Sequence, residues 1–125
     1  MAIYKARAKR KASGGRYHAN HKKKSKDVGR NPLYTKLGET KKKILRARGG
    51  NKITSLTYAN TANLNVAGKS EKVKIKRIVE NAASRHFVRQ NIISKGAIIE
   101  TEKGLARVTS RPTRDGVVNA ILLKK

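Results

Sequence analysis

Positive charge, and its uneven distribution, is the feature that most limits what this chain can fold into. The 125 residues carry 32 Lys and Arg against 7 Asp and Glu, a formal net charge of +25. Residues 1–52 hold 18 of the cations and 2 of the acids, whereas residues 53–125 hold 14 and 5. Like charges at this density destabilise a compact state unless a polyanion is present. The charge therefore predicts a partner with regular negative charge, either nucleic acid or an anionic membrane surface.

Apolar content and cysteine usage exclude several classes of protein. The longest apolar run near the C-terminus, residues 120–123, is far shorter than the roughly 20 residues that a membrane helix needs. No apolar segment follows the first basic residues, so a signal peptide is not predicted. With no cysteine in the chain, neither a disulfide framework nor a thiolate zinc site can form. We expect a soluble, cytoplasmic protein without a membrane partner.

Residues 1–42 predict a basic RNA-binding extension. This segment has few apolar residues and no sustained period of 2 or 3.6. It cannot bury enough apolar surface to offset the entropy of ordering, so we expect it to be disordered when free. Three of its glycines, Gly14, Gly15 and Gly29, either allow close approach of the backbone to a nucleic acid or form a flexible linker.

Residues 43–125 predict a mainly β domain. Apolar and polar residues alternate strictly in 62–66 and 72–76, as they do in half-buried strands. A helix is the alternative at 72–76, because Ile75 and Ile78 also fit helical spacing, but the β-branched content favours a strand. Further strands are predicted at 43–48, 52–58, 97–101, 106–110 and 117–123.

The connections between these strands indicate how they are arranged. Gly49, Gly50 and Asn51 between two strand-like runs predict a hairpin. A short helix is expected between residues 81 and 93, with Asn81 or Ser84 as its cap. Many short strands at close spacing are typical of a small barrel. We therefore predict a small closed or nearly closed β-barrel with a long basic N-terminal extension.

Basic residues of the first 52 positions are the candidate RNA ligands. A cation that neutralises a phosphate releases condensed counterions, and an acid-poor run of cations can bind RNA by this mechanism. The plain alternative for any single patch is a solvated charged face. The candidates are Lys5, Arg7, Lys9, Arg10, Lys11, Arg16, His18, His21, Lys22, Lys23, Lys24, Lys26, Arg30, Lys36, Lys41, Lys42, Lys43, Arg46, Arg48 and Lys52.

Three of the four tyrosines lie in the same basic segment. Tyr4 and Tyr17 stand where no core is expected, so they are candidates for stacking on unpaired bases. Tyr34 has two interpretations: it stacks on RNA in the same way, or it folds back onto the domain with Leu33 and Leu37.

Chemistry-bearing motifs are absent from the sequence. His18 and His21 lie among cations with no carboxylate or thiol expected nearby, which argues against a metal site. The tripeptide at 68–70 ends like a phosphate-binding loop, but Asn63 stands where the motif requires its first glycine. The acids show no pairing suited to acid–base catalysis. We therefore predict a non-catalytic protein without a metal, a cofactor or a small-molecule substrate.

Several segments together resemble the ribosomal protein S8e family, in the short form typical of archaea. Each is weak alone, but they follow the order of the family over nearly the whole chain. They are Lys11-Ala12-Ser13-Gly14-Gly15-Arg16, Gly29-Arg30-Asn31-Pro32, Thr35-Lys36-Leu37-Gly38, Arg46-Ala47-Arg48-Gly49-Gly50-Asn51, and residues 91–101 and 106–112.

The resemblance implies a barrel-like domain on the small ribosomal subunit, with the extension lying along 16S-type RNA. It implies that residues 14–16 and 46–50 contact RNA, and that small-subunit ribosomal RNA and neighbouring small-subunit proteins are the partners. A related ribosome-biogenesis factor shares the module, so a maturation role stays open. The large insertion of eukaryotic members is missing here, and contacts made through it do not transfer.

Two other functions compete with this interpretation. A chromatin-type DNA compactor would explain the charge but not the family segments, and preference for duplex DNA over structured RNA would favour it. An RNA-modifying enzyme would need a catalytic group that the sequence does not show.

Overall fold

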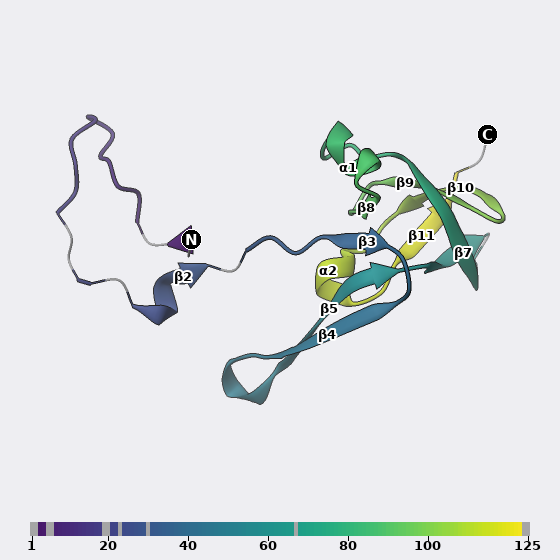
Figure 1. Ribbon diagram of the computed structural model, residues 1–125, viewed down its shortest axis with the longest axis horizontal. Helices are drawn as coiled ribbons and strands as arrows, with labels where there is room; N and C mark the ends of the chain where they lie inside the picture. The colour runs from purple at the N-terminus through teal and green to yellow at the C-terminus, as the bar shows by residue number, and fades with distance from the viewer. Residues whose placement is uncertain are drawn as a thin grey trace. The chain divides into compact units, whose positions relative to one another are not determined.

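The computed structural model describes residues 3–4, 7–18, 21–22, 24–29, 31–66 and 68–123. The chain forms two compact units, residues 1–32 and residues 33–125 (Figure 1). Residues 33–42, which lie in the predicted extension, contribute strand-forming segments to the second unit. The expectation that residues 1–42 are disordered when free stays a prediction.

A closed five-stranded barrel forms most of the second unit. Its strands are β6 (Thr61–Val66), β7 (Lys69–Glu80), β9 (Ile98–Thr101), β10 (Gly104–Val108) and β11 (Asn119–Leu122). They follow the order β10-β11-β6-β7-β9 around the barrel. All neighbours are antiparallel except β11 and β6, which run parallel. The mainly β fold and the closed barrel predicted from the sequence are confirmed.

The barrel interior is filled by one side of each strand. Residues that alternate along a strand point to opposite faces of the sheet, so the pattern of 72–76 places its lysines outside. A five-stranded barrel has little interior space, and small side chains among larger ones fill it. The buried set includes Ala62, Leu64, Val73, Ile75, Ile99, Ala106, Val108 and Ala120. The strand predicted at 72–76 is therefore confirmed over its helical alternative.

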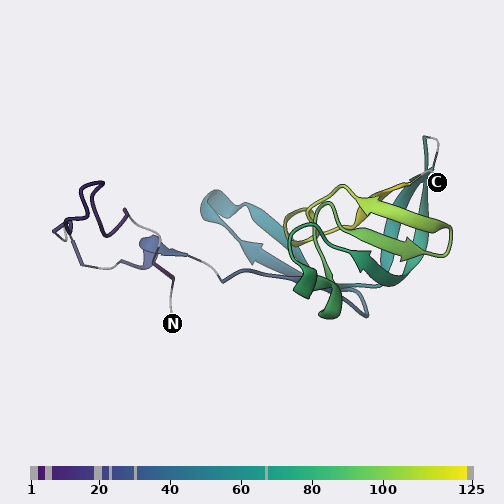
Figure 2. The ribbon, with the colours of Figure 1, turned by 90° about the horizontal axis from the view of Figure 1, so that it is seen from above.

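A second sheet lies beside the barrel. Its order is β4-β5-β3-β8, formed by β3 (Thr35–Leu37), β4 (Lys41–Arg46), β5 (Lys52–Ala59) and β8 (Ile92–Ile93). The 3-10 turn η2 (Arg48–Gly50) joins β4 to β5, and the glycines at its end take φ of 69° and 79°. Such positive φ angles favour glycine. Because β4 and β5 pair antiparallel on either side of this turn, the predicted hairpin is confirmed. The hairpin extends away from the barrel in both views (Figure 1 and Figure 2).

Two short helices complete the second unit: α1 (Arg85–Arg89) and α2 (Pro112–Asp115). The Ser84 side chain accepts a hydrogen bond from the backbone N–H of His86 and caps α1, as one of the two predicted caps. Asn81 is instead buried and donates to the Ile92 carbonyl. The short helix expected between residues 81 and 93 is therefore confirmed as α1; after it, Asn91 takes φ of 52° and residues 92–93 form β8.

The first unit has little regular structure. Strands β1 (Ile3–Tyr4) and β2 (Val28–Gly29) pair antiparallel, and the 3-10 turn η1 (Ser25–Asp27) precedes β2. A single bridge joins Arg10 to Arg16. The described side chains of this unit include no buried apolar residue, so packing contributes little to its order.

Gly116 sets how closely α2 approaches β5. It takes φ of 70° as the C-cap of α2, and a Cβ added there would lie 2.7 Å from Thr54 Cγ2. We predict that Gly116→Ala lowers the free energy of unfolding by about 2–5 kcal/mol, from the left-handed backbone and the overpacking together. Chemical denaturation measures the loss.

Gly96→Ala is the matched control. Gly96 has φ of 84°, but nothing lies within 4 Å of its Cβ position. This variant should show only the backbone cost of about 1–2 kcal/mol. Equal losses in the two variants would contradict close packing of α2 on β5.

Candidate nucleic-acid interface

The β4–β5 hairpin concentrates cations without compensating acids. Residues 41–59 hold six Lys and Arg and no Asp or Glu. Lys41, Lys42, Lys43, Arg46 and Lys52 are all exposed. The structure thus gathers five of the predicted RNA ligands on one projecting element. Arg48 lies in the hairpin turn, but its side chain is outside the described residues.

Cross-strand register places like charges opposite each other. Arg46 pairs with Lys52 next to the turn, while Lys42 opposes buried Leu56. Like charges directly opposite each other in a sheet are destabilising, and here no acid of the hairpin offsets them. A polyanion lying along the hairpin would remove this penalty.

Apolar side chains are exposed between these cations. Ile44 keeps 65% of its surface accessible and Ile53 keeps 37%. Ile44 opposes Thr54, and Ile53 opposes Leu45, so the two isoleucines lie on opposite faces of the hairpin. Each face therefore offers apolar surface next to positive charge, which suits a ribose or a base edge beside its phosphate.

In the first unit, a tight turn organises the cations around Tyr17. The Lys11 N–H donates to the Gly15 carbonyl, and Arg10 donates to the Gly14 carbonyl at 2.8 Å. The Arg7 guanidinium lies 3.9 Å from the centre of the Tyr17 ring, and Lys11 Nζ lies 5.7 Å from it. These distances are typical of cation–π contacts. The Tyr17 ring therefore lies next to two cationic side chains and remains exposed.

His21 has a carboxylate neighbour that sequence reasoning did not expect. Its Nε2 lies 3.0 Å from Asp27 Oδ2. The η1 turn causes this approach, because the Asp27 N–H donates to the Lys24 carbonyl and brings the chain back toward His21. The hydrogen bond from His21 lowers the pKa of Asp27 below its usual 3.8. The prediction that the two histidines have no carboxylate nearby was wrong for His21.

Tyr34 folds back onto the domain. Its ring lies 5.2 Å from that of Phe87, tilted by 56°. This spacing and tilt are those of a favourable aromatic pair, so the structure favours the fold-back alternative over stacking on RNA. Leu37 packs against the buried core, as that alternative expected, whereas Leu33 is exposed.

The remaining candidates lie apart from the hairpin in sequence. Lys36 is exposed on β3, and the described candidates of the first unit are exposed as well: Arg7, Lys9, Arg10, Lys11, Arg16, His18, His21, Lys22, Lys24 and Lys26. Lys5, Lys23 and Arg30 fall outside the described residues, as does the side chain of Tyr4. Their contacts with RNA stay predictions.

The outer face of β7 carries further cations that sequence reasoning did not select. Lys72, Lys74 and Lys76 are exposed between the inward Val73 and Ile75. The candidate RNA ligands were chosen from runs of cations without acids. These three lysines were left out because acids occur nearby in the sequence. Their alternation with β-branched residues was the signal that could have found them.

Acids of the barrel are partly engaged in local pairs. Arg77 Nε lies 2.5 Å from Glu100 Oε2, and Lys103 forms an ion pair with Glu71. Glu100 and Glu71 thus act as local charge partners of neighbouring cations. Among the described residues, no group of three or more His, Asp or Glu is placed to hold a metal ion. The described helices include none with the length and apolarity to cross a membrane.

Comparisons with known proteins identify relatives over the whole length. Residues 4–123 match the family model described as ribosomal protein S8e. The small ribosomal subunit protein eS8 of Methanocorpusculum labreanum is 46% identical over 125 residues, covering 98% of this chain and 99% of that protein. The protein of the same name from Methanococcus aeolicus is 47% identical over 128 residues and covers both chains fully. That of Picrophilus torridus is 45% identical, over 98% of this chain and all of its own.

The His21–Asp27 contact has a testable pH dependence. Because the pKa of Asp27 is lowered, the stabilisation from this contact is fully present at a pH above the usual pKa of an aspartate. It is lost as the pH falls through the lowered pKa of Asp27. The two residues are only six positions apart, so the contact can form locally. We predict that His21→Ala raises the Asp27 titration midpoint toward 3.8, as measured by NMR of the carboxyl carbon. His18→Ala should leave the midpoint unchanged, and an unchanged midpoint in His21→Ala would contradict the contact.

Proposed function

The chain belongs to the ribosomal protein S8e family, and from this premise we propose that it is a structural, non-catalytic constituent of the small ribosomal subunit. In this proposal it binds and braces 16S-type ribosomal RNA by neutralising phosphates. It works in the cytoplasm within the subunit, next to other small-subunit proteins. It uses no cofactor and no small-molecule substrate.

One observation carries the RNA-binding part of the proposal. The β4–β5 hairpin projects from the barrel with six cations and no acid in residues 41–59. A projecting element of this kind gains nothing from its charge in isolation, since Arg46 and Lys52 repel each other across the strands. Phosphates along both faces would turn this repulsion into attraction and would release counterions from the RNA.

Arginine and lysine contribute differently in this scheme. The planar guanidinium of Arg46 can bind a phosphate with two parallel hydrogen bonds or stack on a base, whereas the lysines of β4 act as point charges. In the first unit, Arg7, Arg10 and Arg16 would contact phosphates in the same way. The exposed Tyr17 would add stacking on an unpaired base.

Binding to ribosomal RNA would also stabilise the folded chain. A ligand that binds only the folded form raises its stability by mass action, and here it also screens a net charge of +25. The barrel would fix the orientation of the hairpin. Exposed apolar residues on the barrel strands, such as Leu105 and Ile121, are where neighbouring proteins would pack.

Sedimentation of a cell lysate tests the structural role. We predict that the chain travels with the small subunit at moderate salt and leaves it only at high salt, because phosphate contacts weaken as salt rises. Migration with pre-ribosomal particles alone would instead indicate an assembly factor. Migration with DNA would contradict the proposal.

Charge reversal tests the hairpin. We predict that the double variant Arg46→Glu, Lys52→Glu weakens binding to transcribed small-subunit RNA by at least about tenfold, as the removal of hydrogen bonds to charged groups implies. The dependence of affinity on salt should decrease by roughly 0.7–0.9 in slope for each phosphate that the variant no longer neutralises. Filter binding over a range of salt concentrations measures both quantities.

Arg85→Glu with Arg89→Glu is the matched control. The two substitutions change the net charge by the same amount as the hairpin variant does. Both residues are exposed on α1 and lie outside the hairpin. Equal losses in the two double variants would indicate a general effect of charge and would contradict a specific role of the hairpin. Both variants should keep the melting temperature of the parent, because all four side chains are exposed.

A further inference from the structure

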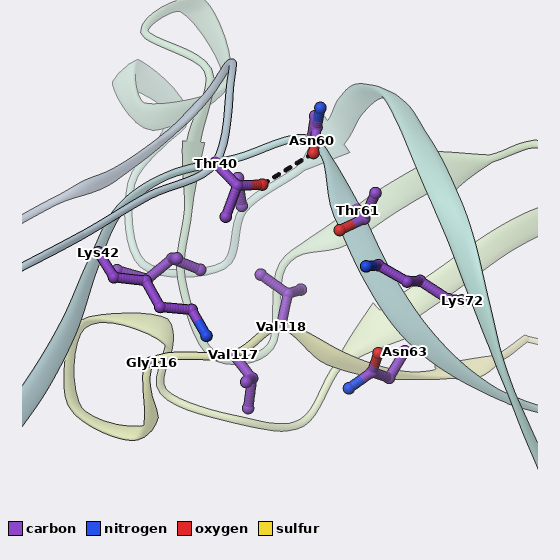
Figure 3. Close-up of a pocket in the computed structure, with 11 residues that line it drawn as sticks. Thr40, Lys42, Asn60, Thr61, Asn63, Lys72, Gly116, Val117 and Val118 are labelled. Carbon is purple, nitrogen blue, oxygen red and sulfur yellow. Dashed lines mark hydrogen bonds between the residues drawn. The ribbon is translucent and has the colours of Figure 1, made fainter.

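A pocket of about 260 Å³ lies where the hairpin sheet meets the barrel. Lys42 of β4 and Lys72 of β7 contribute to its walls, and the segment after α2 forms one side (Figure 3). Figure 3 shows both lysine side chains extending into this space from different strands. All of the lining residues belong to the second unit.

The pocket is positively charged and has no anionic lining. Its walls include Lys42 and Lys72 but no Asp or Glu. The ion pairs in the described part of the chain involve other residues: Glu71 pairs with Lys103, and Glu100 with Arg77. Two ammonium groups that share a concave site without a local counterion favour an anion between them.

Hydrogen bonds among the lining residues determine which polar groups a ligand could use. Thr40 Oγ1 donates to Asn60 Oδ1 at 2.8 Å, so that oxygen is already engaged. Asn63 Nδ2 donates to Asn119 Oδ1 at 3.0 Å, which leaves the Asn63 carbonyl oxygen as an acceptor. The Thr61 hydroxyl lies on the same side of the pocket as Lys72 (Figure 3) and makes no hydrogen bond within the described residues. A ligand hydroxyl that both donates and accepts suits this pair of groups.

The inner wall is apolar. Leu56 and Val118 are each only 3% exposed, and Val117 completes this side. The pocket volume of about 260 Å³ is many times the roughly 10–15 Å³ of probe-occupied volume that one water molecule needs. It accommodates a phosphate group with the ribose attached to it and not a turn of double helix.

We propose that this pocket binds one unpaired nucleotide of the RNA, with its phosphate between Lys42 and Lys72 and its ribose against Val117 and Val118. The 2′-hydroxyl, which can donate and accept, would face Thr61 and Asn63. The proposal rests on the proposed function and deepens it: the hairpin supplies non-specific phosphate contacts, whereas the pocket selects a single-stranded ribonucleotide.

A double-mutant cycle tests whether the two lysines share one phosphate. Lys42→Ala and Lys72→Ala should each weaken binding of the full chain to transcribed small-subunit RNA by about tenfold. Because both act on one ligand group, the double variant should lose clearly less than the product of the two single losses. The control pair is Lys43→Ala, on the opposite face of β4, with Lys76→Ala, farther along β7. Neither of these residues lines the pocket, so their effects should multiply.

The outcomes separate the pocket from the proposed function. Effects of Lys42→Ala and Lys72→Ala that simply multiply, like those of the control pair, would overturn the shared site while RNA binding by the hairpin stands. Failure of the proposed function would appear as unchanged binding in the Arg46→Glu, Lys52→Glu variant as well. The four lysines are exposed, so unchanged melting temperatures should accompany all of these losses.

A titration with small ligands tests the ribose. Uridine monophosphate should shift the NMR signals of Thr61, Asn63 and Val118 in the full chain, and Lys42→Ala with Lys72→Ala should abolish the shifts. Deoxyuridine monophosphate should give smaller shifts, because it lacks the 2′-hydroxyl. Equal shifts with inorganic phosphate would overturn the nucleotide assignment and leave only an anion site.

Discussion

Parallel pairing of β11 with β6 is the contact on which the rest of the second unit depends. It joins the last strand of the chain to the first strand of the barrel, through residues 119–121 and 63–65, and thereby closes the sheet. Closure removes the free edges that an open sheet would present and encloses Leu64 and Ala120. The side-chain hydrogen bond from Asn63 to Asn119 lies at this seam. Gly116, Val117 and Val118, which lead into β11, line the pocket together with residues of β5 and β6.

The apolar side chains that pack together and the cationic side chains occupy different parts of this molecule. The barrel interior is built mainly from aliphatic side chains and holds no ionisable group, whereas the described Lys and Arg side chains are exposed, many of them on the hairpin, the outer face of β7 and the first unit. Repulsion among them acts against the compact state and is not relieved by the few acids, of which Glu71 and Glu100 already have partners. In the isolated chain, the free energy of packing therefore has to offset the repulsion among these surface charges, and the proposed binding of a polyanion would reduce that repulsion.

Sequence patterns predicted the barrel well because its strands follow a strict period of 2, as at 62–66 and 72–76. The hairpin was predictable from Gly49 and Gly50, whose positive φ angles few other residues tolerate. Short elements were missed: β3 and β8 have three and two residues, too few to show a period, and their pairing is decided by tertiary contact. The fold-back of Tyr34 and the position of Lys72 in the pocket also depend on distant segments. Exposure of the predicted cations agrees with their proposed role, and their contacts with RNA stay predictions.

Only Asn60 separates β5 from β6, so the hairpin passes into the barrel without a flexible joint. The Thr40 hydroxyl hydrogen-bonds to the Asn60 side chain, and the Asn60 carbonyl accepts from the Ile75 N–H, so this corner is tied to the residue that precedes β4 and to β7. These contacts limit bending between the hairpin and the barrel. Two strands of RNA, one bound at the hairpin tip and the other at the barrel wall, would be kept at a constant spacing. RNA whose two strands lie at a different spacing could bind the hairpin tip or the barrel wall but not both.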